Sequence, residues 1–281
     1  MSSSTAAFAA GTERMERIIE IDGLSLAFGG LQVLRDVRLD ALRGKVTALI
    51  GPNGAGKTAL LNCISGIYRP QGGRINFDGA DLVGRNPEQI ARLGVARSFQ
   101  NLELFPSLTV LENLLVARDS QFRGGVLGAA VFFGPARRRE IAQREAAERV
   151  IDFFELWSLR HVRAHDLPYG QQKIVGFARA MAADPKLLLL DEPGSGLTRD
   201  EKEDLARFIL RLRFDWQVSI LWIEHDLQMV SDLADRVHVL NLGECIASGT
   251  PDEVKRVPAV INAYVGDEPI AAATPLHVAV R

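Results

Sequence analysis

Short apolar runs, separated by turns or by longer helical patterns, organise most of this sequence. Over residues 18–49 apolar and polar positions alternate around a double-glycine turn, which predicts a group of short strands. Continuous apolar runs at residues 46–50, 187–190 and 218–223 predict strands that are buried on both faces. Because helical patterns separate these runs, we expect an α/β fold with a parallel sheet and a small antiparallel β subdomain beside it.

A different pattern covers about residues 103–166. Here apolar residues such as Val150 recur at helical spacing with mixed charges between them, which predicts an inserted helical subdomain. The first residues, 1–17, and the last, 267–281, show no clear periodicity. We therefore expect one domain over residues 18–266 with a loose tail at each end.

Composition narrows the possible partners. The chain has 281 residues, a net charge of -2 and a pI of about 6.2, so it carries no basic surplus that would favour nucleic acid. Cys63 and Cys245 form no metal-spaced cluster and indicate a reduced, cytosolic chain. The apolar run at residues 126–133 is far shorter than the roughly 20 residues that a membrane-spanning helix needs.

One segment matches the phosphate-loop pattern of P-loop NTPases, directly after the strand expected at residues 46–50. Its glycines let the backbone wrap the phosphates of ATP, Lys57 neutralises their charge, and the Thr58 hydroxyl can bind Mg²⁺. The nucleotide-binding residues expected here are Gly51, Pro52, Asn53, Gly54, Ala55, Gly56, Lys57, Thr58 and Ala59.

Four further polar residues follow predicted strands and should meet at the carboxyl edge of the sheet. Asp191 is placed to hold Mg²⁺, and Glu192 to act as the general base on the attacking water. His225 is a candidate contact of the γ-phosphate, and Gln100 a candidate sensor of Mg²⁺ and water. The alternative is that the carboxylates cap a strand and that His225 is a structural histidine.

A second turn suited to an anion lies at residues 167–172, at the mouth of a predicted helix. Because the chain already has a phosphate loop, this turn suggests a shared site in which Tyr169, Gly170 and Gln171 close over ATP held by another subunit. Phe28, beside the double-glycine turn, is a candidate for stacking on adenine; the alternative is a core aromatic of the small sheet.

Together these motifs resemble the ATP-binding subunits of ABC transporters over about residues 18–266. Within that family the sequence is most similar to importers of branched-chain amino acids. The segments that carry the likeness are 28–31, 97–101, 111–117, 169–173, 223–227 and 263–266.

The resemblance implies an ATPase with ATP and Mg²⁺, working as a head-to-tail pair with a second ATPase subunit, identical or different. It also implies two multi-span permease subunits, an extracytoplasmic solute-binding protein, no nucleic acid, and a peripheral position on the cytoplasmic face of the plasma membrane. The expected permease contact is a cleft along residues 102–115, with Leu104 and Phe105 gripping a short helix.

Three positions depart from the family pattern. Pro168 replaces the usual serine, Ala59 a hydroxyl residue, and Thr198 an aspartate or asparagine. They suggest an active but slow ATPase, or the catalytically weak half of an asymmetric pair. Importers of urea, amides or aromatic acids remain alternatives for the substrate, and a soluble ABC ATPase that acts on nucleic acid or the ribosome is the alternative class.

Overall fold

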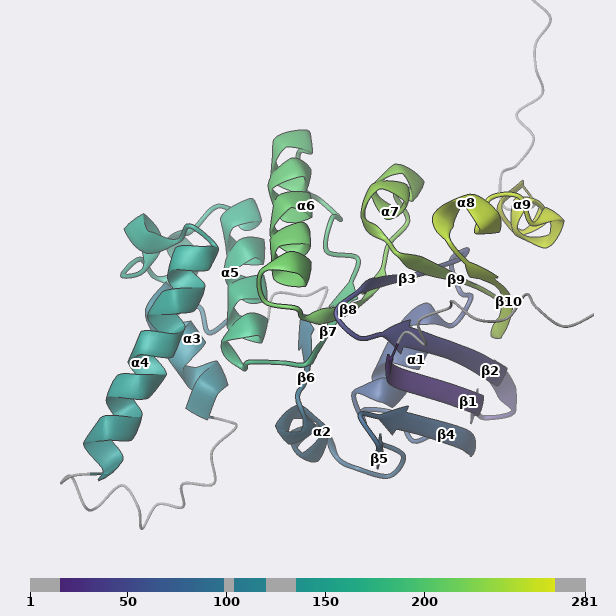
Figure 1. Cartoon of the computed structure of the whole chain (residues 1–281), viewed down its shortest axis with the longest axis horizontal. Coiled ribbons are helices and arrows are strands. Elements are labelled where there is room, and N and C mark those ends of the chain that lie inside the picture. The colour runs from purple at the N-terminus through teal and green to yellow at the C-terminus, as the bar shows by residue number, and fades with distance from the viewer. Residues whose placement is uncertain (1–15, 99–103, 120–134, 266–281) are drawn as a thin grey trace, which may run out of the picture.

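The computed structural model describes residues 16–98, 104–119 and 135–265, and contains two sheets (Figure 1). A six-stranded sheet has the order β10-β9-β3-β8-β7-β6, and a four-stranded sheet has the order β2-β1-β4-β5. Every neighbouring pair in the larger sheet is parallel except the pair β9 and β10. The predicted α/β fold with a parallel and a small antiparallel sheet is therefore confirmed.

The strand bounds agree with the apolar runs of the sequence. The antiparallel sheet consists of β1 (Arg17–Phe28), β2 (Leu31–Leu42), β4 (Gly72–Phe77) and β5 (Ala80–Asp81). The larger sheet consists of β3 (Val46–Ile50), β6 (Val95–Ser98), β7 (Leu187–Asp191), β8 (Ser219–Ile223), β9 (Arg236–Asn241) and β10 (Glu244–Gly249).

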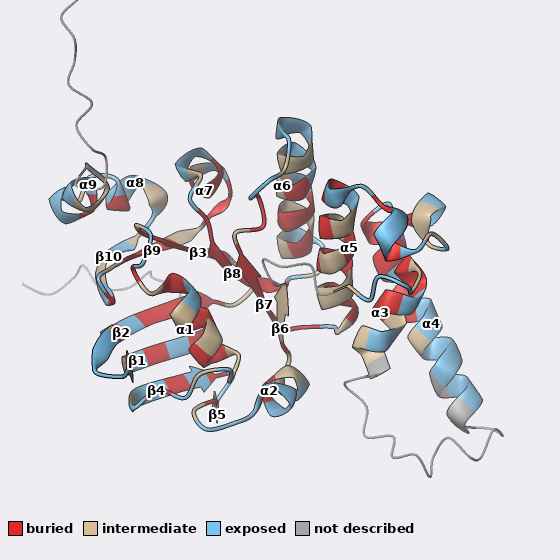
Figure 2. Cartoon of the chain, turned by 180° about the vertical axis from the view of Figure 1, so that it is seen from behind, coloured by how far each residue is buried: buried red, intermediate tan, exposed pale blue. Residues whose placement is uncertain are grey.

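The parallel sheet separates the two larger of three hydrophobic cores in the described residues, and β7 shows how. Leu188 and Leu190 pack into one core, while Leu187 and Leu189 pack into the other. Successive side chains of a strand point to opposite faces, so a strand covered on both sides needs apolar residues at every position. Figure 2 shows the result, since the central strands are buried along their length while the outer faces of the helices are exposed.

Helices cover both faces of the parallel sheet (Figure 1). One face carries α1 (Lys57–Ile64), α2 (Pro87–Leu93) and the antiparallel sheet. The other carries α6 (Arg199–Phe214), α7 (Leu227–Leu233), α8 (Pro251–Val254) and α9 (Pro258–Val265). A lobe at one end contains α3 (Val110–Asp119), α4 (Pro135–Phe153) and α5 (Tyr169–Ala182), with short 3₁₀ turns at Trp157–Leu159 and Ala164–Asp166.

Some expectations concern residues at the limits of the described chain. β1 begins at Arg17, the last residue of the predicted N-terminal tail. Residues 1–15 and 267–281 of the two predicted tails lie outside the described residues. Gln100 and the apolar run at 126–133 lie outside them as well. None of the described helices is long and apolar enough to cross a membrane.

Candidate functional site at the carboxyl edge of the parallel sheet

The phosphate loop connects the end of β3 to the start of α1, and close backbone contacts fix its path. A Cβ atom on Gly51 would lie 2.0 Å from the Leu240 carbonyl oxygen on β9. Gly56, the N-cap of α1, has a φ of 100°, and a Cβ there would lie 2.9 Å from the Val33 carbonyl oxygen. Glycine is therefore required at both positions, because any side chain would push the loop off its neighbours.

Lys57 is the cation inside this loop, and only 6% of its surface is exposed. Its ammonium donates to the carbonyl oxygens of Gly51, at 2.7 Å, and Pro52, at 2.8 Å. Burial lowers the pKa of Lys57, while the carboxylates of Glu192 and Asp191 oppose that shift. The two carboxylates predicted from the sequence thus lie close enough to the lysine of the phosphate loop to affect its pKa.

Asp191 ends β7 and forms a buried ion pair with Arg97 of β6. The guanidinium lies 2.8 Å from Asp191 Oδ2, and the same group donates to Asn62 Oδ1 on α1 at 2.6 Å. Within the described residues, Asp191 Oδ1 is buried and has no hydrogen-bond partner. A buried carboxylate oxygen costs free energy unless something binds it, and a hard cation such as Mg²⁺ prefers such an oxygen.

Glu192, the predicted general base, follows Asp191 at the end of β7. Its backbone has a φ of 48°, which is uncommon for a residue with a side chain, and its N–H donates to the Ile223 carbonyl at 3.0 Å. The carboxylate Oε1 lies 2.7 Å from Nε2 of His225, two residues beyond β8. The structure thus brings Glu192 and His225 together, as expected from strand ends that share one edge.

The signature turn, residues 167–172, forms the N-terminus of α5. Tyr169 is the first helical residue, and Pro168 is the N-cap, whose side chain has no hydrogen-bonding atom. Gly170 is buried against α6, where a Cβ would lie 1.7 Å from Oε1 of Glu201. The first backbone N–H groups of a helix have no partner within it, so Tyr169, Gly170 and Gln171 present a positive end.

The remaining sequence candidates differ in position. Phe28 is 47% exposed at the end of β1, and its ring meets Tyr68 edge to face at 5.0 Å. Thr58 is exposed in the first turn of α1, whereas Ala59 is half-buried against the core between α1 and the antiparallel sheet. Gln100 lies outside the described residues, so its predicted role remains a prediction.

The structure also gives roles to residues that the sequence left without one. Thr198 caps α6, because its hydroxyl accepts from the Glu201 N–H and the Glu201 carboxylate accepts from the Thr198 N–H at 2.8 Å. The sequence signal for this capping box was Thr198 followed three residues later by Glu201. Arg97 and Lys173, the latter buried in α5, had no comparable signal, because each acts on a residue distant in sequence.

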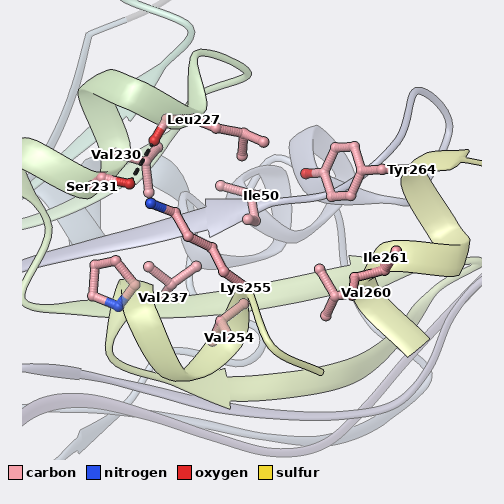
Figure 3. A pocket seen from close by; sticks show the side chains of 11 residues that line it. Ile50, Leu227, Val230, Ser231, Val237, Val254, Lys255, Val260, Ile261 and Tyr264 are labelled. Atoms are coloured by element: carbon pink, nitrogen blue, oxygen red, sulfur yellow. Dashed lines mark hydrogen bonds between the residues drawn. The ribbon is translucent and has the colours of Figure 1, made fainter. Parts of the chain in front are cut away.

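Behind the phosphate loop lies an apolar cavity of about 200 Å³, formed where α7, α8 and α9 meet the sheet (Figure 3). Tyr264 of α9 and Ile50, the last residue of β3, both line it. Burial raises the pKa of Tyr264 to about 12, and the backbone N–H of Gly51 partly offsets that rise. The last helix of the domain therefore packs against the start of the phosphate loop.

A strand, a glycine loop with an inward lysine, and an Asp-Glu pair at the end of β7, the next strand but one in the same sheet, define a P-loop nucleotide-binding ATPase. The open turn at α5 and the lobe that contains it add the features of an ATP-binding cassette. Comparison with known proteins agrees, since residues 34–195 match the family described as ABC transporter. The chain belongs to the ABC transporter family.

Curated relatives align with nearly the whole domain. The high-affinity branched-chain amino acid transport ATP-binding protein BraF of Pseudomonas aeruginosa is 42% identical over 253 residues, which is 89% of this chain and 98% of that protein. The corresponding protein LivG of Escherichia coli is 41% identical with the same coverage. Both are ATP-binding proteins of transport systems by name.

Solved structures give the same fold. A nucleotide-free ATP-binding cassette from an ABC transporter is 29% identical, with a TM-score of 0.77, covering 89% of this chain and all of that one. The ADP conformation of another such cassette is 30% identical, with a TM-score of 0.78 and coverage of 89% and 99%. The chain is thus similar to cassettes solved both without nucleotide and with ADP.

Proposed function

We propose that this chain is the ATP-hydrolysing subunit of an importer for branched-chain amino acids. The observation that carries the proposal is the pairing of Glu192 with His225 at 2.7 Å, on the sheet edge that also holds Lys57 and Asp191. The substrate class rests on the relatives, whose names specify branched-chain amino acid transport.

The residues divide the work of hydrolysis. The loop amides and Lys57 hold the β- and γ-phosphates and offset their charge. Glu192 takes a proton from the attacking water, and His225, held against the same carboxylate, fixes its orientation and reaches toward the γ-phosphate. The left-handed backbone at Glu192 supports this role, because such conformations are kept where they position a group.

Asp191 and Thr58 are the described residues suited to hold Mg²⁺. The buried, unpartnered Oδ1 of Asp191 offers the hard oxygen that the ion prefers, and the exposed Thr58, the second residue of α1, adds a hydroxyl next to Lys57. When bound, the ion would neutralise charge on the phosphate oxygens. Gln100 is proposed as the further ligand or sensor predicted from the sequence.

The nucleotide site is completed by a second ATPase subunit. The open N-terminus of α5, with Tyr169, Gly170 and Gln171, is placed in our proposal against the γ-phosphate of ATP held by that partner. Phe28, with nearly half of its surface exposed, would stack on the adenine of the ATP bound to its own phosphate loop. The partner in this proposal is either a second copy of this chain or a related ATPase chain.

Phe105 is the proposed contact with a permease on the cytoplasmic face of the membrane. Its backbone is held by buried Asn113, which bonds the Phe105 N–H at 2.9 Å and carbonyl at 3.2 Å. Its ring is 44% exposed and lies 5.2 Å from the Arg179 guanidinium. The fixed backbone of Phe105 and its exposed apolar ring support a docking role. Leu104 instead packs against the hydrophobic core that contains Leu188 and Leu190.

Membrane association tests the docking surface. Phe105→Asp should release the subunit from membranes. Nucleotide affinity should stay unchanged, because Phe105 is exposed and is not part of the proposed nucleotide site. Phe214→Asp is the matched control, since that ring is 65% exposed at the end of α6. Membrane binding that survives Phe105→Asp, or that is lost equally in both variants, would contradict the proposed surface.

Uptake in the source organism tests the whole function. Deletion of the gene should abolish high-affinity uptake of labelled leucine, isoleucine and valine, and a wild-type copy should restore it. A Glu192→Gln copy should not. Loss of urea, amide or aromatic-acid uptake instead would reassign the substrate. Full restoration by Glu192→Gln would place the chain as the catalytically weak member of its pair.

A further inference from the structure

Lys173 is a buried cation that lies outside the phosphate site. It sits one turn into α5, four residues after Tyr169, and 6% of its surface is exposed. Burying an ammonium is costly unless oxygen atoms replace its water, so the contacts of this group indicate why it is there. Its four-carbon side chain extends from α5 to the loop that follows Glu192.

The ammonium binds the loop at residues 193–198 through two backbone carbonyls. It donates to the Pro193 carbonyl at 3.2 Å and also to the Ser195 carbonyl. This loop begins directly after Glu192, and the Ser195 N–H returns to the Glu192 carbonyl at 3.1 Å. Lys173 therefore holds Pro193, which directly follows the proposed general base, and Ser195, which hydrogen-bonds to its carbonyl.

Nearby charges favour the ammonium form. Burial lowers the pKa of Lys173, and the carboxylates of Glu224 and Glu192 oppose that shift. Glu224 is itself buried and accepts from the indole N–H of Trp222 at 3.3 Å. Lys173 thus supplies positive charge to a buried region that contains two carboxylates.

The signature turn grips the same loop at a second point. The Tyr169 ring lies 5.4 Å from the Lys173 ammonium, and a Cβ on Gly196 would lie 3.3 Å from that ring. Tyr169 is the first residue of α5, so the signature turn and Lys173 both contact this loop.

We propose that Lys173 is a positioning residue that couples the signature turn to Glu192 of the same subunit. The inference rests on the proposed function, in which the signature turn meets ATP held by the partner. Binding of the signature turn to the partner's ATP would then fix the position of the loop at residues 193–198. Because this loop directly follows Glu192, the Glu192 carboxylate beside the subunit's own phosphate loop would be positioned as well. One lysine would link the two ATP sites of the pair.

Replacing Lys173 tests this coupling. Lys173→Met should leave nucleotide affinity within about twofold of wild type, because the phosphate loop is untouched. It should lower kcat by about 10- to 100-fold, since a small misplacement of a catalytic group has effects of this size. Lys173→Arg keeps the charge and several donors, and should recover most of the rate.

Amide hydrogen exchange tests the contact between Lys173 and the loop at residues 193–198 without an activity assay. Amides of residues 193–198 should exchange faster in Lys173→Met than in wild type or in Lys186→Met, whose lysine is exposed and pairs with Asp78. Lys173→Gln, which keeps a donor without the charge, is measured in the same way if the methionine variant unfolds. Absence of wild-type turnover would count against the proposed function, while exchange still reports the contact.

Three results would overturn the proposal. The first is unchanged exchange at residues 193–198 in folded Lys173→Met. The second is turnover within twofold of wild type in that variant. The third is an arginine variant as impaired as the methionine variant, which would show that shape and not charge matters at Lys173.

Discussion

Two helices of this molecule begin at turns suited to an anion, and the turns are built differently. α1 starts inside a loop that Gly51 and Gly56 press against neighbouring backbone, and Lys57 folds into that loop. α5 starts at an exposed turn after Pro168, and its buried cation, Lys173, points away to the loop after Glu192.

The difference shows which turn is complete within one chain. The phosphate loop has its own cation and a fixed backbone, so one subunit can bind nucleotide there. The α5 turn has N–H groups that lack a partner within the helix, and its lysine, Lys173, donates to the loop after Glu192 instead. Such a turn suits a phosphate delivered with its charge already partly neutralised. Variants that affect one turn and spare the other should therefore separate nucleotide binding from turnover.

The largest separation should come from Glu192→Gln. Removing a general base typically costs about 10²–10⁴ in rate, while the phosphate and metal contacts stay intact. ATP affinity should therefore be normal, and the protein should accumulate as a closed pair with ATP and Mg²⁺ in size-exclusion chromatography with its partner ATPase. A variant that stays monomeric under those conditions would count against a shared site.

Lys57→Ala should act on the phosphate loop and should chiefly weaken nucleotide binding. A hydrogen bond to a charged group contributes about 1.5–3 kcal/mol, or roughly 10- to 100-fold in affinity. Nucleotide titration should show this loss in the isolated subunit, where the α5 turn plays no part. Near wild-type affinity and turnover would show that the loop amides suffice and would remove Lys57 from the site.

Asp226 provides a third helix start for comparison, one that is capped by an acidic side chain of the chain itself. Its carboxylate caps α7 by accepting from the N–H groups of Gln228 and Met229, each at 3.2 Å. Asp226→Ala should lower the free energy of unfolding by about 1 kcal/mol at pH 7, the usual contribution of an N-cap. Nucleotide affinity should not change, because Asp226 is not among the residues proposed to contact the nucleotide.

The same substitution has a defined pH dependence. The Met229 N–H and, to a lesser extent, Lys202 lower the pKa of Asp226 below its ordinary value of 3.8. The carboxylate therefore stabilises the fold fully above that value and loses its contribution as pH falls through the depressed pKa. Urea unfolding should show a constant gap between wild type and Asp226→Ala from pH 8 to 5, which narrows below about pH 3.8.

Pro168→Ser should have the smallest effect. Serine fits an N-cap position and adds one hydroxyl at the open turn, worth about 0.5–1.5 kcal/mol if it reaches the partner's phosphate. Turnover should rise by about two- to tenfold, and only when the partner's phosphate loop is intact. An unchanged rate would mean that the amides of Gly170 and Gln171 already saturate the contact.

The sequence predicted the strands and the shared edge because both depend on local pattern and topology. Apolar runs located β3, β7 and β8, and parallel order then placed Lys57, Asp191 and His225 together. The capping box of Thr250 and Glu253 at the start of α8 also depends on local pattern, since its two residues are three positions apart.

Contacts between distant segments were not readable in the same way. Arg97 and Asp191 are separated by 94 residues and meet only because β6 lies beside β7. Lys173 reaches residues 20 and 22 positions later through a fold in the chain, and a lysine in a helix ordinarily indicates a solvated face. Side-chain neighbours across elements are set by tertiary packing, which periodicity does not encode.

The contact between Gly51 and Leu240 has a consequence for how the protein becomes competent during synthesis. The family match ends at residue 195, by which point the ribosome has made the phosphate loop, the signature turn and both carboxylates. Yet β3 lies between β8 and β9, and the Leu240 carbonyl that packs against Gly51 belongs to β9. A nascent chain that carries nearly every nucleotide motif should therefore remain unable to hold nucleotide until its last quarter has emerged and inserted beside β3.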